Sequence, residues 1–216
     1  PQGGETLAVS LQLPSKTPVM SAGKVDAELS IGSQQLNGVW NRQLANFDSF
    51  DLQLSDLALE DAAKQGRLTL AGLSASSGRS EEQGNWVESF RGELRRLAFT
   101  DATTQWQVDT IGGRGEASGT NPKRFLELRI KVQQGLKYID TLPPAEAKAL
   151  MADLDEYLHL FSTYTSSAKV NDIRVSSKVG TFGLRGITFA GDIHKEADGK
   201  FVYTSQGQGN DLTFAE

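Results

Sequence analysis

Apolar and polar residues alternate along most of this chain, on both sides of one central segment. Runs with this period of two cover residues 6–13, 25–31, 50–54, 68–73, 105–111 and 201–203. In a β-strand successive side chains point to opposite faces, so each run is typical of a half-buried strand. The pattern therefore predicts a large, mostly antiparallel sheet.

The central segment, residues 121–166, has the spacing of helices instead. Its first apolar set recurs three or four residues apart at Phe125, Leu128, Val132, Leu136 and Ile139. Pro143 and Pro144 interrupt it, and a second set follows at Ala147, Leu150, Leu154, Leu158 and Phe161. One face of a 3.6-residue helix requires this spacing. We expect an α+β fold in which this two-helix insert (about 121–166) packs on a curved sheet.

The entry to the first predicted helix allows two interpretations. Glycines at 112–119, followed by Lys123 and Arg124, could hold an anion at a helix start, where free amides and the helix dipole favour negative charge. However, the spacing matches no phosphate-binding motif. Asn121 and Pro122 are better explained as the N-cap and the first helical residue. Lys123 and Arg124 remain candidates for contact with an anionic head group.

Three further patterns concern loops and repeats. Residues 74–84 are polar and predict a mobile loop between strands. Asp198 and Gly199 are the clearest hairpin signal. A similar phrase returns at 94–101, 184–192 and 211–216, with two apolar residues two positions apart and an acidic residue close behind. The irregular spacing of the phrase excludes a solenoid period. The repeated phrase indicates either the apolar-polar-apolar-turn pattern that sheets in general share, or an elongated sheet built from successive similar hairpins.

Composition narrows the class of protein. A chain of 216 residues can form one β-rich domain, which we place at 1–216. A net charge of -5 argues against a nucleic-acid partner. With no cysteine, disulfides and thiolate sites are excluded, which fits a periplasmic protein. No run of eighteen apolar residues is present, and the chain begins with Pro1. We therefore expect an excised soluble part of a longer, membrane-anchored or secreted chain.

The sequence contains no recognisable catalytic or metal motif. His159 and His194 are the two histidines, and neither has metal-ligand spacing. Asp153 and Glu156 lie one helical turn apart and could act as an acid/base pair, but the spacing favours a solvated helix face. No GxSxG elbow is present. We expect no enzyme activity, no cofactor and no metal.

Part of the chain resembles a known family. The residues concerned are 94–101, the helical pair at 125–161, 170–175 and 180–189. They resemble the YdgA-like family of bacterial envelope proteins. The resemblance implies a largely periplasmic, membrane-proximal protein anchored by an N-terminal segment, of poorly defined function. It carries over no catalytic residue.

Two functions follow as hypotheses. In the first, a lipid or other amphiphile binds between the sheet and the helices. The lining would be Phe125, Leu128, Val132, Leu136, Leu150, Leu154 and Phe161, with Lys123 and Arg124 at the head group. In the second, the core is dry and a sheet edge or helix face binds another envelope protein. A cavity between helices and sheet favours the first hypothesis, and a filled interface favours the second.

Overall fold

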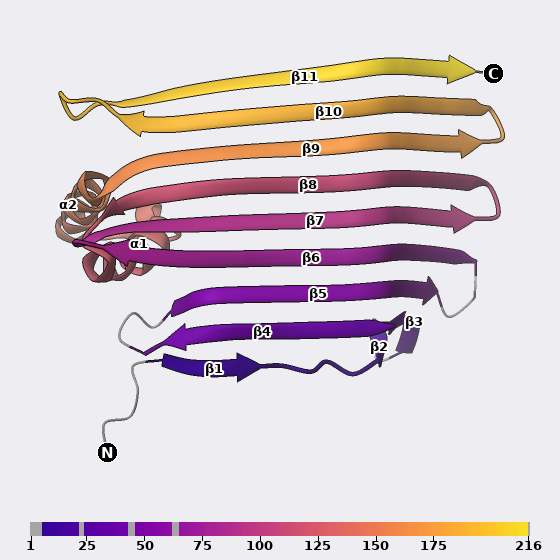
Figure 1. The fold of residues 1–216 in the computed structure, drawn as a ribbon, viewed down its shortest axis with the longest axis horizontal. Helices are drawn as coiled ribbons and strands as arrows, with labels where there is room; N and C mark the ends of the chain where they lie inside the picture. The colour runs from indigo at the N-terminus through magenta and orange to yellow at the C-terminus, as the bar shows by residue number, and fades with distance from the viewer. Residues whose placement is uncertain (1–5, 22–23, 43–45, 62–64, 216) are drawn as a thin grey trace.

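The computed structural model describes residues 6–21, 24–42, 46–61 and 65–215, so Pro1 and Glu216 lie outside the described residues. In this part of the chain the main feature is one open, eleven-stranded antiparallel sheet (Figure 1). Its strands are β1 (Thr6–Ser10), β2 (Lys16–Ser21), β3 (Lys24–Ser30), β4 (Ser33–Asn41), β5 (Asn46–Asp61), β6 (Gly66–Glu82), β7 (Asn85–Asp101), β8 (Thr104–Thr120), β9 (Phe161–Ser177), β10 (Gly180–Lys195) and β11 (Phe201–Ala215). The helices are α1 (Pro122–Leu136), a 3-10 turn (Ile139–Thr141) and α2 (Pro144–Leu160). The predicted combination of a mostly antiparallel sheet and two helices is confirmed.

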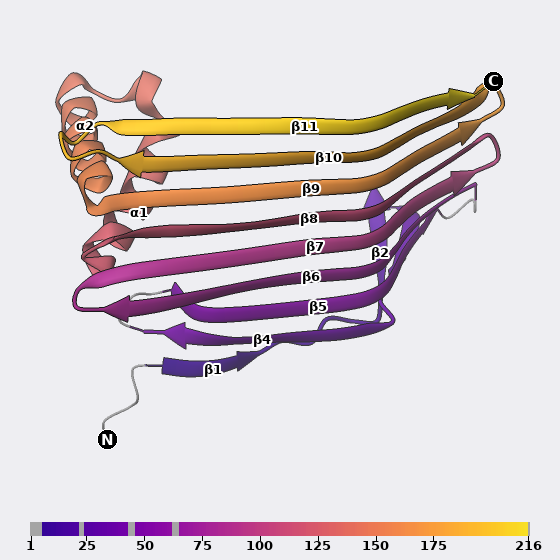
Figure 2. The ribbon, with the colours of Figure 1, turned by 45° about the horizontal axis from the view of Figure 1, so that its top comes forward.

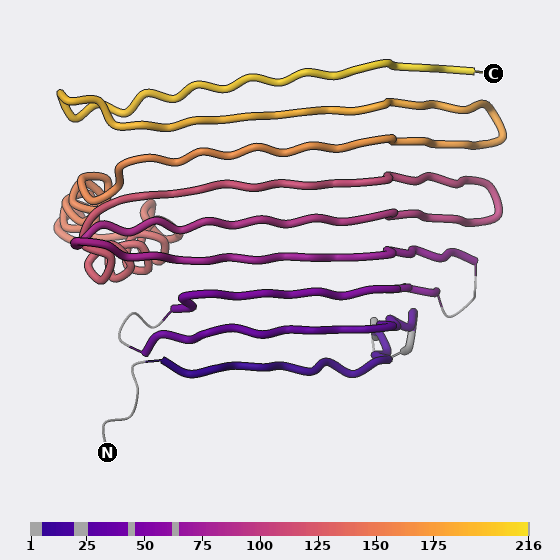
Figure 3. The backbone as a smooth tube through the Cα atoms, in the orientation of Figure 1, coloured from indigo at the N-terminus to yellow at the C-terminus, as the bar shows by residue number. Residues whose placement is uncertain are grey.

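Strands that neighbour one another in the sheet are mostly consecutive in the chain. The order is β1-β4-β5-β6-β7-β8-β9-β10-β11, and β3 of the β2–β3 hairpin also pairs with β5. The backbone trace therefore runs back and forth across the molecule (Figure 3). Strands β8 and β9 pair directly although both helices lie between them in the sequence. The helical insert is thus a long connection between two adjacent strands.

Two predicted boundaries are wrong. Helix α2 ends at Leu160, and residues 161–166, predicted to belong to the insert, form the start of β9. Residues 74–82, predicted to lie in a loop, belong to β6: residues 74–78 pair with both β5 and β7, and residues 79–82 pair with β7. Both stretches are rich in serine and threonine, and their backbone amides and carbonyls pair with neighbouring strands. Pairing with neighbouring strands offsets their low apolar content.

In the half of the sheet nearer the helices, the strand register places mainly apolar side chains on one face and mainly polar side chains on the other. Residues directly opposite one another on paired strands point to the same face. One face there carries a row formed by Leu54, Leu73, Leu94, Ile111, Val170 and Ile187. We call it the apolar face. The next row on the opposite face is formed by Gln53, Ser74, Glu93, Gly112, Lys169, Thr188 and Gln208, and we call that face the polar face.

A line of unpaired positions crosses the sheet beside this apolar row. Asp56, Ala71, Arg96, Asp109, Asp172, Arg185 and Asp211 occupy it. On alternate strands the residue at this line has a positive φ: Asp56 51°, Arg96 49°, Asp172 49° and Asp211 49°. The ribbons of the long strands change direction together there (Figure 2), and we call the feature the bend line. Because a left-handed residue breaks the alternation, leucines three apart, such as Leu94 and Leu97, share the apolar face.

The helices contact one end of the sheet. Trp86 of β7 is 1% exposed and packs against Phe125 and Leu126 of α1, with Ala117, Tyr157, Leu160 and Phe161 around them. The N-cap prediction for α1 is confirmed, since the Arg124 amide donates to Asn121 Oδ1 at 3.3 Å. The Asn121 amide in turn donates to the Gly84 carbonyl at 2.9 Å, which ties the helix start to the β6–β7 turn.

Candidate functional site

The predicted lining residues lie mainly in contacts between the helices and the strand ends. Phe125, Leu128, Val132 and Leu150 are buried, whereas Leu136 is exposed. Leu154 and Phe161 are partly buried. The Phe125 ring lies 4.3 Å from the Trp86 ring and 4.8 Å from the Tyr157 ring, measured between centroids. Phe125 therefore fills its position between helix and sheet. A filled interface is the outcome that favours the second hypothesis for this location, so an amphiphile would have to bind on another surface.

Arg124, one of the two head-group candidates, is already engaged. Its Nε donates to Glu156 Oε1 at 2.6 Å and its Nη2 donates to Glu156 Oε2 at 2.5 Å. This pair raises the pKa of Arg124 and lowers that of Glu156. It joins the start of α1 to the last turns of α2. Lys123 is exposed beside it, and no ion pair of Lys123 occurs among the described residues.

Several apolar side chains of the apolar face are exposed to solvent on β10 and β11. Ile187 is 42% exposed and Phe189 is 43% exposed, although both stand within paired strands. Toward the β11 edge, Leu212 reaches 70%. Among the described strand residues, only Ala58 and Trp86 have apolar side chains below 9% exposure, and Ile31 in the β3–β4 connection is the nearest addition. In many proteins a group of exposed apolar side chains of this kind lies where another molecule binds.

The centre of the apolar face contains a row of small residues. Ala75, Gly92, Gly113 and Ala168 stand opposite one another on β6 to β9, and Phe189 continues the row on β10. A Cβ atom on Gly92 would meet only the Ser74 carbonyl at 3.8 Å, and one on Gly113 only the Ser167 carbonyl at 3.4 Å. Local packing therefore does not require these glycines. Glycine weakens a strand interior, and one that packing does not require is typical of a place where another molecule approaches closely.

Arg79 is a buried cation at the helix end of the same face. Its side chain is 2% exposed, and its guanidinium lies 5.6 Å from the centroid of the Trp86 ring. Its Nε is 3.2 Å from Glu81 Oε1, but the geometry is not that of a hydrogen bond. None of its three guanidinium nitrogens has a hydrogen-bond partner within the described residues. A buried cation with unmet donors is costly, so Arg79 is not explained by packing alone.

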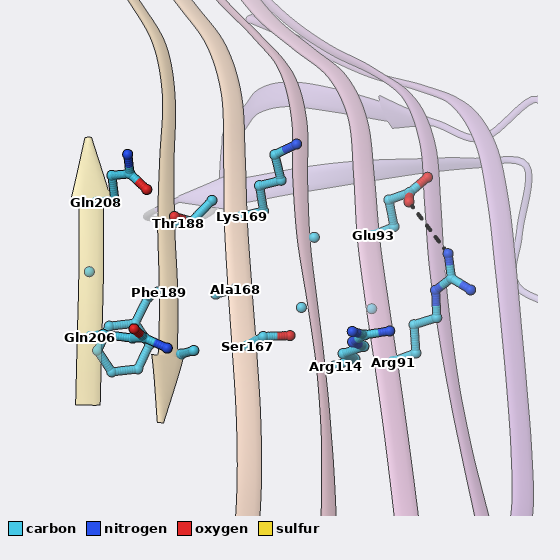
Figure 4. A pocket seen from close by; sticks show the side chains of 15 residues that line it. Arg91, Glu93, Arg114, Ser167, Ala168, Lys169, Thr188, Phe189, Gln206 and Gln208 are labelled. Atoms are coloured by element: carbon cyan, nitrogen blue, oxygen red, sulfur yellow. Dashed lines mark ion pairs between the residues drawn. The ribbon is translucent and has the colours of Figure 1, made fainter. Parts of the chain in front are cut away.

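The polar face carries two adjoining hollows. The larger, of about 840 Å³, is lined by residues of β7 to β11, including Arg91, Arg114 and Lys169 (Figure 4). The second, of about 750 Å³, shares Arg91, Arg114 and Ser167 with it. No residue of α1 or α2 lines either hollow. The hollows therefore belong to the sheet and are distinct from the contacts around Phe125.

The acidic residues and histidines considered in the sequence are held in separate pairs. Asp153 pairs with Lys131 and Glu156 with Arg124, so the two carboxylates are held by separate cations. Asp153 is mostly buried rather than solvated, its side chain 13% exposed. His194 Nδ1 lies 2.8 Å from Asp192 Oδ1 on the polar face. Within 6–21, 24–42, 46–61 and 65–215, no three His, Asp or Glu side chains gather as a metal site.

Sequence reasoning missed both the small-residue row and Arg79. The glycines of 112–119 were considered only as an anion-binding entry to the first helix, yet they lie in β8. Their signal was present, because Gly92 and Gly113 interrupt apolar alternation on consecutive strands. Arg79 lies in the stretch predicted to be mobile, and its burial follows from the Trp86 ring beneath it. The small-residue row and Arg79 come together only through the register in which the strands pair, which the sequence does not give.

Comparisons with known proteins add no relative. No protein-family model, no curated protein and no solved structure matches this chain. The resemblance to the YdgA-like family therefore stays a prediction. Among the helices that the structure describes, none is long and apolar enough to cross a membrane.

Proposed function

We propose that this chain is a non-enzymatic binding protein that holds the apolar tail of an anionic amphiphile against the apolar face of its sheet. In this proposal the bend line curves the sheet, and the helix pair packs on it and bounds the apolar face at one end. The location that suits this function is the bacterial cell envelope, close to a membrane.

The uncovered apolar face supports the proposal most. A row of large side chains, including Leu94, Ile111 and Val170, borders the small-residue row on the side of the bend line. On the other side Phe90 lies over Gly115. The row from β6 to β9 spans about 14 Å at the usual strand spacing, the scale of one extended acyl chain. Burial of apolar surface would supply the binding energy, at roughly 25 cal/mol for each Å².

Arg79 supports an amphiphile with a negative head group. It stands on β6 four residues from Ala75, on the same face and toward the helices. A carboxylate or phosphate there would satisfy guanidinium donors that lack hydrogen bonds in the described structure. Because the side chain is covered, binding would require the side chains above it to shift. This assignment takes the head-group role from Arg124, which is paired with Glu156.

The test uses a saturated fatty acid and the fatty alcohol of equal chain length, with binding measured by displacement of a fluorescent fatty acid and by native mass spectrometry. Ile187→Gln/Phe189→Gln changes two exposed apolar side chains, so the fold should persist while affinity falls at least fivefold. Thr188→Gln, on the opposite face of the same strand, is the matched control and should bind normally. Wild-type protein that retains neither amphiphile, or equal binding by all three proteins, would overturn the proposal.

The edge strand β11 favours a second candidate function. It lies at the end of the strand order, and from Tyr203 to its last residues its side chains are exposed. An unpaired edge of this length can accept a strand from another protein. Hydrogen exchange separates the two functions. A partner strand would protect the outward amides of 201–215, whereas an amphiphile on the apolar face would leave them exchanging freely.

A further inference from the structure

The geometry points to a second binding site, on the polar face, for a phosphorylated or sulfated saccharide. The site is the larger hollow, and Arg91, Arg114 and Lys169 provide its positive charge (Figure 4). The charged and polar side chains of the hollow stand on the face opposite the amphiphile surface. The hollow is also lined by Gly92, Gly113, Ala168 and Phe189 of the small-residue row, so the two sites are tested with separate variants and probes.

The three cations stand on neighbouring strands, close to one another in register. Arg91 on β7 and Arg114 on β8 are directly opposite in register. Their Cβ atoms are therefore about 5 Å apart, a spacing at which like charges destabilise a sheet. Lys169 stands on β9 opposite Gly112, diagonal to Arg114. Within the described ranges no carboxylate lies within ion-pair distance of Arg114 or Lys169, and Arg91 reaches Glu93 only at 4.0 Å. A bound oxyanion would relieve this repulsion.

Gly112 leaves the floor between these cations open. It occupies the polar row between Glu93 and Lys169. A Cβ atom there would meet only the Gly92 carbonyl at 3.8 Å, so packing does not demand a glycine. Its missing side chain lets an anion approach the backbone between the two arginines and the lysine.

The rest of the hollow suits a sugar. Its volume of about 840 Å³ exceeds what an inorganic oxyanion fills. Hydroxyls and amides line it, from Ser167, Thr188, Gln206 and Gln208, and the carboxylate of Glu93, opposite Gly112 in register, lines it as well. This mixture of hydrogen-bond donors and acceptors matches the hydroxyl groups of a saccharide. The cations would hold its phosphate or sulfate through charge-assisted hydrogen bonds.

The experiment compares four probes by calorimetry and thermal shift at constant ionic strength: glucose 6-phosphate, glucose, inorganic phosphate, and phosphatidylcholine vesicles containing phosphatidylglycerol. We expect glucose 6-phosphate to bind tightest and to raise the Tm. Arg114→Gln should weaken that binding at least tenfold without lowering the Tm of the free protein, because it removes a like-charge neighbour. Arg174→Gln, at an exposed arginine of β9 outside the hollow, is the matched control and should leave binding unchanged.

Three outcomes would overturn the site. The first is equal affinity for glucose 6-phosphate in Arg114→Gln and Arg174→Gln. The second is a Tm shift that potassium chloride reproduces at the same ionic strength, which would indicate charge screening alone. The third is binding of the vesicles without binding of the sugar phosphate, which would assign the cations to a membrane surface.

Discussion

Gly135 of α1 lies so close to Leu150 of α2 that no larger residue fits. A Cβ atom on Gly135 would stand 2.5 Å from Leu150 Cδ1 and 2.9 Å from Cδ2. Leu150 is 5% exposed, so its side chain has little room to withdraw. The glycine, which costs a helix interior about 1 kcal/mol relative to alanine, is therefore explained by the approach of the two helices.

Gly135→Ala should lower the free energy of unfolding by about 1–2 kcal/mol, because overpacking outweighs the gain in helix propensity. Urea denaturation followed by circular dichroism measures it. The matched background is Leu150→Ala, which removes the clashing atoms. In that background Gly135→Ala should become stabilising. A destabilisation of equal size in both backgrounds would show that Leu150 is not the cause.

Arg79→Met should stabilise the empty protein. Methionine has a similar length and can rest on the Trp86 ring, while the buried charge with unmet donors is removed. Glu81, the residue left behind, is 41% exposed and stays hydrated. We expect the free energy of unfolding to rise by about 1–3 kcal/mol in urea denaturation. The same variant should lose the preference for the fatty acid over the fatty alcohol.

The matched control for Arg79→Met is Arg67→Met. Arg67 is 60% exposed and pairs with Glu60 at 3.1 Å on the surface. Its replacement should change stability by less than about 0.5 kcal/mol. If Arg79→Met destabilises the protein by several kcal/mol, the guanidinium has partners in solution, and its assignment as an unsatisfied anchor is wrong.

The β7–β8 turn should give a measurable acid dependence. Asp101 accepts hydrogen bonds from the Thr103 amide at 2.7 Å and the Thr104 amide at 2.8 Å, and both lower its pKa. Because the folded pKa is below the unfolded value of about 3.9, this stabilisation is complete above that pH. It is lost as the pH falls through the folded pKa. Carboxyl NMR shifts should give a midpoint below the ordinary range.

Two variants test this acid dependence. Asp101→Asn keeps an acceptor oxygen but cannot titrate, so its stability curve should be flatter at acid pH than that of the wild type. Thr103→Val removes the hydroxyl that donates to Asp101 at 2.9 Å and should move the Asp101 midpoint upward. An Asp101 midpoint at or above the ordinary value would contradict the turn geometry.

The sequence correctly predicted a helix cap and a hairpin turn, because both are stabilised by residues close together in the chain. Asn121 caps α1 as expected, and Asp198 and Gly199 lie in the β10–β11 hairpin, where Gly199 has a φ of 85°. The prediction for residues 74–82 was wrong because pairing with neighbouring strands, rather than apolar content of their own, holds them in the sheet. The start of β9 failed for the same reason, since Phe161 continues the helical spacing until pairing with Gly119 overrides it.

The bend line shows a signal that was visible but not interpreted. The repeated phrase at 94–101 and 184–192 was noticed for its apolar pairs two apart, whereas the informative spacing is Leu94 to Leu97 and Leu184 to Ile187, three apart. A single pair of apolar residues three apart does not identify a strand, whose period is two, and is too short to identify a helix. The three-residue spacing indicates a bend line only when the neighbouring strands carry the same spacing at the same register.

Two adjacent arginines provide the sharpest test of the bend line. Arg96 has a φ of 49°, whereas Arg95, its neighbour on β7, does not have a positive φ. Glycine relieves the strain of a left-handed residue, about 1–2 kcal/mol, at an entropic cost of about 0.5–1 kcal/mol. Arg96→Gly should therefore stabilise the sheet slightly, and Arg95→Gly should destabilise it by about 1 kcal/mol. Urea midpoints measure both variants. Equal losses would mean that Arg96 is an ordinary strand residue, and that the sheet in solution does not bend there.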